Sequence, residues 1–116
     1  MPLEASDLQG FFSWVYNFVM LFDPENNETR ALFDLYPDFG GKRVLEIGCG
    51  DGRLTWRYAE RVASLIAIDP NADKLARAQA SRPPGTQHVH FHNLDLEAFA
   101  ARNGGTFDLA ILSWSL

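Results

Sequence analysis

Residues 44–53 place the strongest constraint on the fold of this chain. They read VLEIGCGDGR, an apolar run that breaks into three glycines at alternate positions. Arg43–Ile47 is predicted to be a short strand, and the apolar spacing that follows predicts a helix over about 52–61. The glycines therefore lie where a strand turns into a helix, which is where ligands bind in doubly wound sheets. The missing side chains allow a tight turn and let a ligand lie against the backbone.

Strands and helices are predicted to alternate along the rest of the chain. The strands are expected at 65–68, 88–92 and 107–114, and the helices at 72–80, capped by Asn71, and at 97–101. Alternation of this kind predicts βαβ units with right-handed crossovers, and hence a parallel sheet covered by helices. The expected fold class is α/β, a Rossmann-like three-layer parallel sheet of about four strands.

The first 40 residues are predicted to form a helical extension, and residues 41–116 the Rossmann-like domain. Within the extension we expect helices over about 4–21 and 27–35. Residues 11–22 are strongly apolar, but a membrane-spanning helix needs about 20 residues, so we expect no membrane span. The apolar helix is expected to pack on the sheet, with a lid over a ligand as the alternative.

Charge and cysteine content exclude some classes of protein. The net charge of −5 at pH 7 argues against general nucleic-acid binding. Cys49 is the single cysteine, so no internal disulfide forms; this is typical of a reducing compartment, and we expect a cytoplasmic protein.

The chain ends just after its fourth predicted strand, whose apolar edge carries no charge or proline. We therefore expect either a longer natural domain or self-association through that exposed strand.

Acidic residues surround the glycine loop. Glu46 and Asp51 lie in it, and Asp69 follows the second predicted strand of the domain. The loop reads G-x-G-x-G, and Arg53 stands where the dinucleotide-binding motif has its third glycine. The negative charge of the loop disfavours binding of a pyrophosphate and favours a cationic ligand. A carboxylate at the position of Asp69 can accept hydrogen bonds from a ribose diol. These residues favour an adenosine-type ligand with a positive charge over NAD.

Four motifs in order make the chain resemble the class I S-adenosylmethionine-dependent methyltransferases. They are Glu46-x-Gly48-x-Gly50-x-Gly52, Ile68-Asp69, Asn93-Leu94-Asp95 and Phe107-Asp108-Leu109. The resemblance covers about residues 42–116, the cofactor half of that fold. It implies S-adenosylmethionine as the cofactor and methyl transfer as the activity. The cofactor-binding residues that it implies are Glu46, Gly48, Cys49, Gly50, Gly52, Asp69, Pro70, Asp95, Leu96 and Ser113.

The resemblance also implies a role for each part of the site. The loop from Glu46 to Gly52 would line the methionine end of the cofactor, and Asp69 would take the ribose hydroxyls. Asp95, with the backbone of Leu96, would face the adenine edge, and Ser113 would lie beside the cofactor after the fourth strand. No catalytic base is identified, since the strands that supply much of the acceptor pocket are not in this sequence.

Alternatives stand beside these assignments. Methyltransferases that act on amino groups of nucleic acids or glutamine often carry Asn/Asp-Pro-Pro-aromatic after the fourth strand, whereas residues 113–116 read SWSL. This difference favours a small-molecule acceptor. A non-catalytic binding or partner subunit with the same fold is the main rival, and an NAD-dependent oxidoreductase is opposed by Arg53.

Asp69 and Asp95 could each be only a turn or cap residue. His88, His90 and His92 are expected on a solvated face, and no metal site is predicted.

Overall fold

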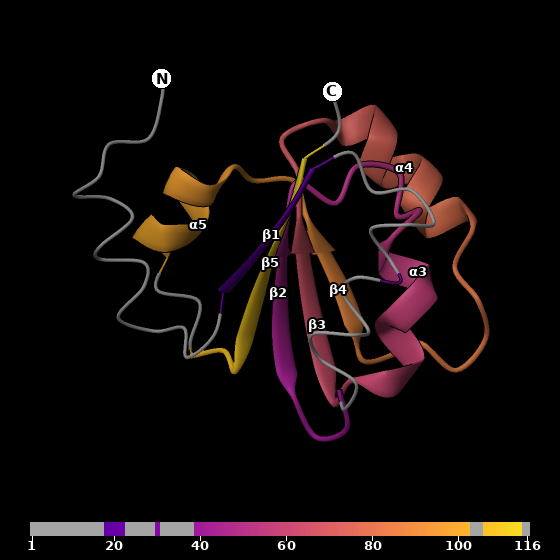
Figure 1. The fold of residues 1–116 in the computed structure, drawn as a ribbon. Helices are drawn as coiled ribbons and strands as arrows, with labels where there is room; N and C mark the ends of the chain where they lie inside the picture. The colour runs from indigo at the N-terminus through magenta and orange to yellow at the C-terminus, as the bar shows by residue number, and fades with distance from the viewer. Residues whose placement is uncertain (1–17, 23–29, 31–38, 103–105, 115–116) are drawn as a thin grey trace.

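The computed structural model describes residues 18–22, 30, 39–102 and 106–114. They form a five-stranded sheet with the order β1-β5-β2-β3-β4, in which all neighbouring strands are parallel (Figure 1). The strands are β1 (Phe18–Phe22), β2 (Arg43–Ile47), β3 (Ser64–Ile68), β4 (Val89–His92) and β5 (Leu109–Trp114). The helices are α3 (Thr55–Tyr58), continued by a 3₁₀ turn at Ala59–Arg61, α4 (Ala72–Ala80) and α5 (Leu96–Ala101).

Helices cover both faces of the sheet, so the predicted three-layer α/β fold is confirmed. Helices α3 and α4 lie on one face and α5 lies on the other (Figure 1). Successive residues of a strand point to opposite faces, so Val44 packs with Tyr58 on the α3 side while Leu45 packs with Phe99 on the α5 side. Strands β2 and β3 each have a neighbouring strand on both sides and are mostly buried on both faces, and the nearly continuous apolar sequence of β3 predicts this burial.

Most elements of the domain lie where the sequence predicts them. Strand β2 and helix α4 have the predicted bounds, and β3, β4, β5 and α5 differ from the prediction by one or two residues at one end. Helix α3 begins at Thr55, later than the predicted residue 52. The reason is that residues 51–54 form turns, in which the Gly52 N–H donates to the Cys49 carbonyl at 3.1 Å.

The N-terminal segment differs from the prediction. Phe18–Phe22 is strand β1, paired in parallel with β5 so that Phe18 lies opposite Ala110 and Phe22 opposite Trp114. The predicted helix over 4–21 is therefore wrong at 18–21, because a short apolar run fits a buried strand as well as a helix. The rest of that helix, and the helix at 27–35 apart from Arg30, lie outside the described residues.

The position of β1 also corrects the expectation of an exposed last strand. Strand β5 lies between β1 and β2, so both of its edges are hydrogen-bonded. Self-association through an open β5 edge therefore loses its basis, and the sheet has one strand more than predicted. Residues on both sides of the predicted boundary at residue 41 share this sheet. Among the described residues, none of the helices has the length and apolar character that crossing a membrane requires.

Candidate functional site

The glycine loop follows β2 at the carboxyl end of the sheet. Gly48, Gly50 and Gly52 have φ angles of +77°, +58° and +82°, values that strain any residue with a side chain. The backbone N–H groups of Gly48 and Cys49 both donate to the Ile68 carbonyl, at 2.8 and 3.1 Å. The loop is thus fastened to the end of β3 and has a defined conformation.

The glycines differ in what surrounds them. A Cβ atom at Gly52 would lie 2.9 Å from the Cβ of Ala78 and 3.0 Å from Nε1 of Trp56, so this glycine permits close packing against α4. Among the residues that the structure describes, a Cβ atom at Gly50 would meet only Cδ of Lys74, at 3.8 Å. The backbone at Gly50 is therefore open to the approach of a ligand, while Gly52 has a packing role.

Asp69 links the glycine loop to the start of α4. Its side chain is mostly buried, with 8% of the residue exposed. Its Oδ2 accepts a hydrogen bond from the Gly50 N–H at 2.9 Å, and its Oδ1 accepts one from the Asn71 N–H at 2.8 Å. Since each carboxylate oxygen has two lone pairs, Asp69 retains acceptor capacity for ligand hydroxyl groups. The turn role and the ligand role are therefore compatible.

Glu46 lies beneath the loop and is fully buried. Its Oε1 accepts hydrogen bonds from Oγ1 of Thr55 at 2.8 Å and from the hydroxyl of Tyr58 at 2.6 Å. Burial raises the pKa of Tyr58 well above its ordinary value, and the charge and hydrogen bond of Glu46 raise it further. Tyr58 therefore keeps its proton and acts as a donor. Glu46 remains a predicted site residue, and the contacts described join its carboxylate to α3.

Cys49 is buried between two glycines of the loop. Burial raises the pKa of its thiol, and the negative charges of Glu46, Asp69 and Asp51 add to that increase. The thiol therefore stays neutral, as expected of a small residue in a tight site rather than of a reactive nucleophile. The three carboxylates act on the thiol in the same direction, although burial is the largest cause of its raised pKa.

The remaining predicted site residues lie around this carboxyl end. Asp95 caps α5, because its Oδ1 accepts a hydrogen bond from the Ala98 N–H at 2.7 Å. Leu96 is buried and Pro70 is exposed. Ser113 belongs to the last residues of β5, and its side chain lies outside the described part of the structure.

Three residues with contacts to this site had no role assigned from the sequence. Thr55 and Tyr58 hold the Glu46 carboxylate, and the Asn93 side-chain amide donates to the Asp69 carbonyl at 3.0 Å. The spacing from Glu46 to the two hydroxyls carries no recognisable motif, so a single sequence offers no signal for that network. Asn93 belongs to the Asn93-Leu94-Asp95 motif, but that motif alone assigns no role to its side chain.

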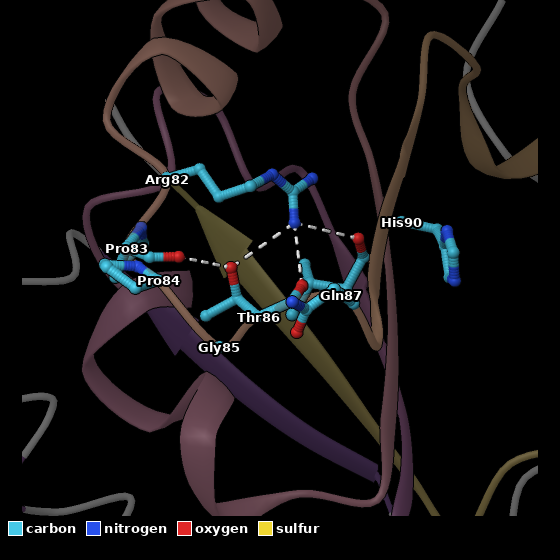
Figure 2. Close-up of a pocket in the computed structure, with 8 residues that line it drawn as sticks. Arg82, Pro83, Pro84, Gly85, Thr86, Gln87 and His90 are labelled. Atoms are coloured by element: carbon cyan, nitrogen blue, oxygen red, sulfur yellow. Dashed lines mark hydrogen bonds between the residues drawn. The ribbon is translucent and has the colours of Figure 1, made fainter.

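A hollow of about 610 Å³ lies elsewhere, beside the loop that leads into β4 (Figure 2). It is next to the amino end of β4, whereas the glycine loop follows the carboxyl end of β2. Nη1 of Arg82 donates to the carbonyls of Thr86 at 2.7 Å and Val89 at 3.2 Å, and its guanidinium lies 5.4 Å from the Trp56 ring. Arg82 thus fastens its own loop, and this hollow is not the candidate site.

The predicted histidine stripe is only partly solvated. His90 is exposed, but Nε2 of His88 lies 2.6 Å from the carbonyl oxygen of Ala59. Within the described ranges, no group of three His, Cys, Asp or Glu residues is arranged to hold a metal ion.

Comparison with known proteins supports the resemblance seen in the motifs. Residues 44–116 match the methyltransferase domain family, which is more than half of the chain. A ubiquinone biosynthesis O-methyltransferase from Aromatoleum aromaticum is 39% identical over 69 residues, covering 60% of this chain and 30% of that protein. A tRNA1(Val) (adenine(37)-N6)-methyltransferase from Yersinia pestis is 30% identical over 80 residues, covering 65% of this chain and 32% of that protein. The chain thus spans about a third of the length of these relatives.

Solved structures agree on the fold. The precorrin 8W decarboxylase of Methanobacterium thermoautotrophicum superposes with a TM-score of 0.67 at 20% identity, covering 77% of this chain and 48% of that protein. The YcgJ protein of Bacillus subtilis gives a TM-score of 0.55 at 19% identity, covering 61% of this chain and 31% of that protein. Together with the family match and the ordered motifs around Gly48 and Asp69, these likenesses show that the chain belongs to the class I S-adenosylmethionine-dependent methyltransferase family.

Proposed function

We propose that this chain binds S-adenosylmethionine and forms the cofactor-binding part of a methyltransferase. The observation that carries the proposal is the position of Asp69. Its carboxylate lies at the carboxyl end of β3 and accepts a hydrogen bond from Gly50, where an added Cβ would make an ordinary contact with Lys74 and no clash. A ligand lying on Gly50 would therefore have this carboxylate next to it, as the ribose of an adenosine requires.

The residues around the loop suit the parts of that cofactor. The open backbone at Gly50 would border the methionine part, and Asp69 would accept the ribose hydroxyl groups. The backbone N–H of Leu96 is at the first position of α5, where an N–H has no partner within the helix, and would face the adenine edge. The Oδ1 of Asp95 already caps α5, so its role toward adenine would be shared with that cap.

The charge of the site suits a cation. The cofactor supplies a methyl group already activated by a positively charged sulfur. Glu46, Asp51 and Asp69 place negative charge around the loop, and after the larger effect of burial each of them raises the pKa of the Cys49 thiol. The task of the protein is then to bind the cofactor and the acceptor, to orient the acceptor in line with the methyl carbon, and to exclude water. That task needs no strong catalytic group from these residues.

The acceptor is proposed to be a small molecule. The net charge of −5 provides little attraction for a nucleic acid, and residues 113–116 lack the Asn/Asp-Pro-Pro-aromatic motif. Similarity to the transfer RNA methyltransferase of Yersinia pestis favours a second candidate, an RNA acceptor. Transfer of a labelled methyl group to small hydroxyl compounds, compared with transfer to total transfer RNA, separates the two candidates.

Calorimetric titration with S-adenosylhomocysteine, with NAD as the control ligand, tests the cofactor proposal. We expect saturable binding of S-adenosylhomocysteine and none of NAD, because Arg53 occupies the third-glycine position of the dinucleotide motif. Binding of NAD alone would indicate an oxidoreductase site. A chain that is folded by circular dichroism but binds neither ligand would overturn the proposal and favour a non-catalytic subunit with this fold.

A further inference from the structure

Glu46 is a buried carboxyl group, and two neighbouring hydroxyl groups donate hydrogen bonds to it. A fully buried carboxylate tends to take up a proton, because desolvation disfavours the charged form. Here Thr55 and Tyr58 both donate to the same oxygen, Oε1, at 2.8 and 2.6 Å. Hydrogen bonds donated to a carboxylate favour its charged form, and they oppose the effect of burial.

The geometry of α3 fixes these two donors. Thr55 and Tyr58 are three residues apart on one short helix, so their side chains lie on the same face. Both residues are fully buried, which leaves their hydroxyl groups no solvent to bind. Tyr58 keeps its proton, so both hydroxyl groups act as donors to the Glu46 carboxyl group. A carboxyl group with two hydrogen-bond donors is thus held at the end of β2, directly before the glycine loop.

We propose that Thr55 and Tyr58 are positioning residues that keep Glu46 charged beneath the glycine loop, so that the site prefers a ligand with a positive sulfur over its neutral product. This inference rests on the proposed cofactor function. Methyl transfer leaves the electron pair of the broken carbon–sulfur bond on the sulfur, so S-adenosylhomocysteine is neutral at that atom. Attraction to a buried negative charge then weakens when transfer is complete, which favours release of the product.

The test compares dissociation constants of S-adenosylmethionine and S-adenosylhomocysteine by calorimetry in one set of variants. Glu46→Gln removes the charge and keeps an amide oxygen that can accept from both hydroxyl groups. We expect it to lower the preference for the cationic ligand by roughly tenfold, the effect of a charge–charge interaction of about 1.4 kcal/mol. Thr55→Val and Tyr58→Phe each remove one donor and are expected to lower the same preference by a smaller factor.

Thr86→Val is the matched control. Thr86 is also buried, and its hydroxyl donates to the Pro83 carbonyl at 2.8 Å, but it precedes β4 at the opposite end of the sheet. Its loss is expected to lower stability and leave the preference between the two ligands unchanged. If Thr55 and Tyr58 serve stability alone, their substitution would weaken the binding of both ligands by the same factor.

The outcomes separate this inference from the proposed function. If the unmodified chain binds both ligands and its preference is the same in Glu46→Gln, the inference is wrong and the cofactor function stands. If the folded unmodified chain binds neither ligand, the proposed function fails and the inference fails with it. Glu46→Gln keeps the size of the side chain and an oxygen that can accept from both hydroxyl groups, so it decides the question even if Tyr58→Phe or Thr55→Val does not fold.

Discussion

Gly52→Ala tests whether the glycine loop packs against α4 as closely as the structure shows. An alanine Cβ there would lie 2.9 Å from the Cβ of Ala78 and 3.0 Å from Nε1 of Trp56. Overpacking of this kind costs about 1–3 kcal/mol. The φ angle of +82° adds roughly 1–2 kcal/mol for a residue with a side chain. We therefore expect a loss of about 2–5 kcal/mol in the free energy of unfolding.

Gly85→Ala is the matched control for that substitution. Gly85 has a similar φ of +77°, but an added Cβ would meet no atom of the described part of the chain within 4 Å. Backbone strain and the effect on the unfolded chain are then the same in both variants, so they cancel in the comparison. The difference between the variants isolates the contact with α4 and is expected to be about 1–3 kcal/mol.

Urea unfolding followed by circular dichroism measures both free energies. A difference of 1 kcal/mol corresponds to a shift of about 4–8 °C in the melting temperature of a domain of this size, so thermal unfolding gives a second measurement. Adding Ala78→Gly to Gly52→Ala should restore part of the lost stability, because it removes the nearer of the two clashing atoms. Equal destabilisation in Gly52→Ala and Gly85→Ala would refute the close approach of the loop to α4.

Three further substitutions or conditions test other contacts. Asp69→Ala should weaken binding of S-adenosylhomocysteine by about 1–3 kcal/mol in a calorimetric titration, because charge-assisted hydrogen bonds are lost; an unchanged affinity would contradict the role of Asp69. The Cys49 thiol should react with iodoacetamide at pH 8 far more slowly in the folded chain than in urea, since burial raises its pKa; similar rates would mean that the loop opens readily. Hydrogen bonds from Arg43 lower the pKa of Asp108 below its ordinary value of 3.8, so this pair stabilises the fold above that pH and the effect is lost as the pH falls through the folded value. Arg43→Leu should therefore cost less than about 1 kcal/mol at pH 6, as expected of an exposed pair, and a smaller amount at pH 2; an equal cost at both pH values would show that the charge is irrelevant.

Local signals explain why much of the domain could be predicted from the sequence. Asn71 precedes the alanine-rich helix, and its side chain accepts a hydrogen bond from the Lys74 N–H at 3.0 Å, so the cap that the sequence indicates is present. The glycine loop was equally predictable, because only glycine tolerates the backbone angles found at Gly48, Gly50 and Gly52. In both cases, the physical cause lies within a few residues of the feature.

Features that depend on distant partners could not be predicted in this way. Phe18–Phe22 is a strand because β5 offers it a hydrogen-bonding edge, and that edge is formed by residues 109–114. Its apolar run has no period that separates a short strand from a buried helix. The hydroxyl groups of Thr55 and Tyr58 gain their importance only from contact with Glu46, which lies on another element.

The acids of the site already hold parts of the protein in place, and this has a consequence for ligand binding. Glu46 holds two hydroxyl groups of α3, Asp69 holds the backbone of Gly50 and Asn71, and Asp95 holds the first turn of α5. These contacts order the glycine loop and the flanking helices before any ligand arrives. Binding then loses little free energy to ordering, so a larger share of each new hydrogen bond appears as affinity. Two of these acids, Glu46 and Asp69, also place negative charge around Cys49 in the loop, so contacts that stabilise the fold also favour a cationic ligand.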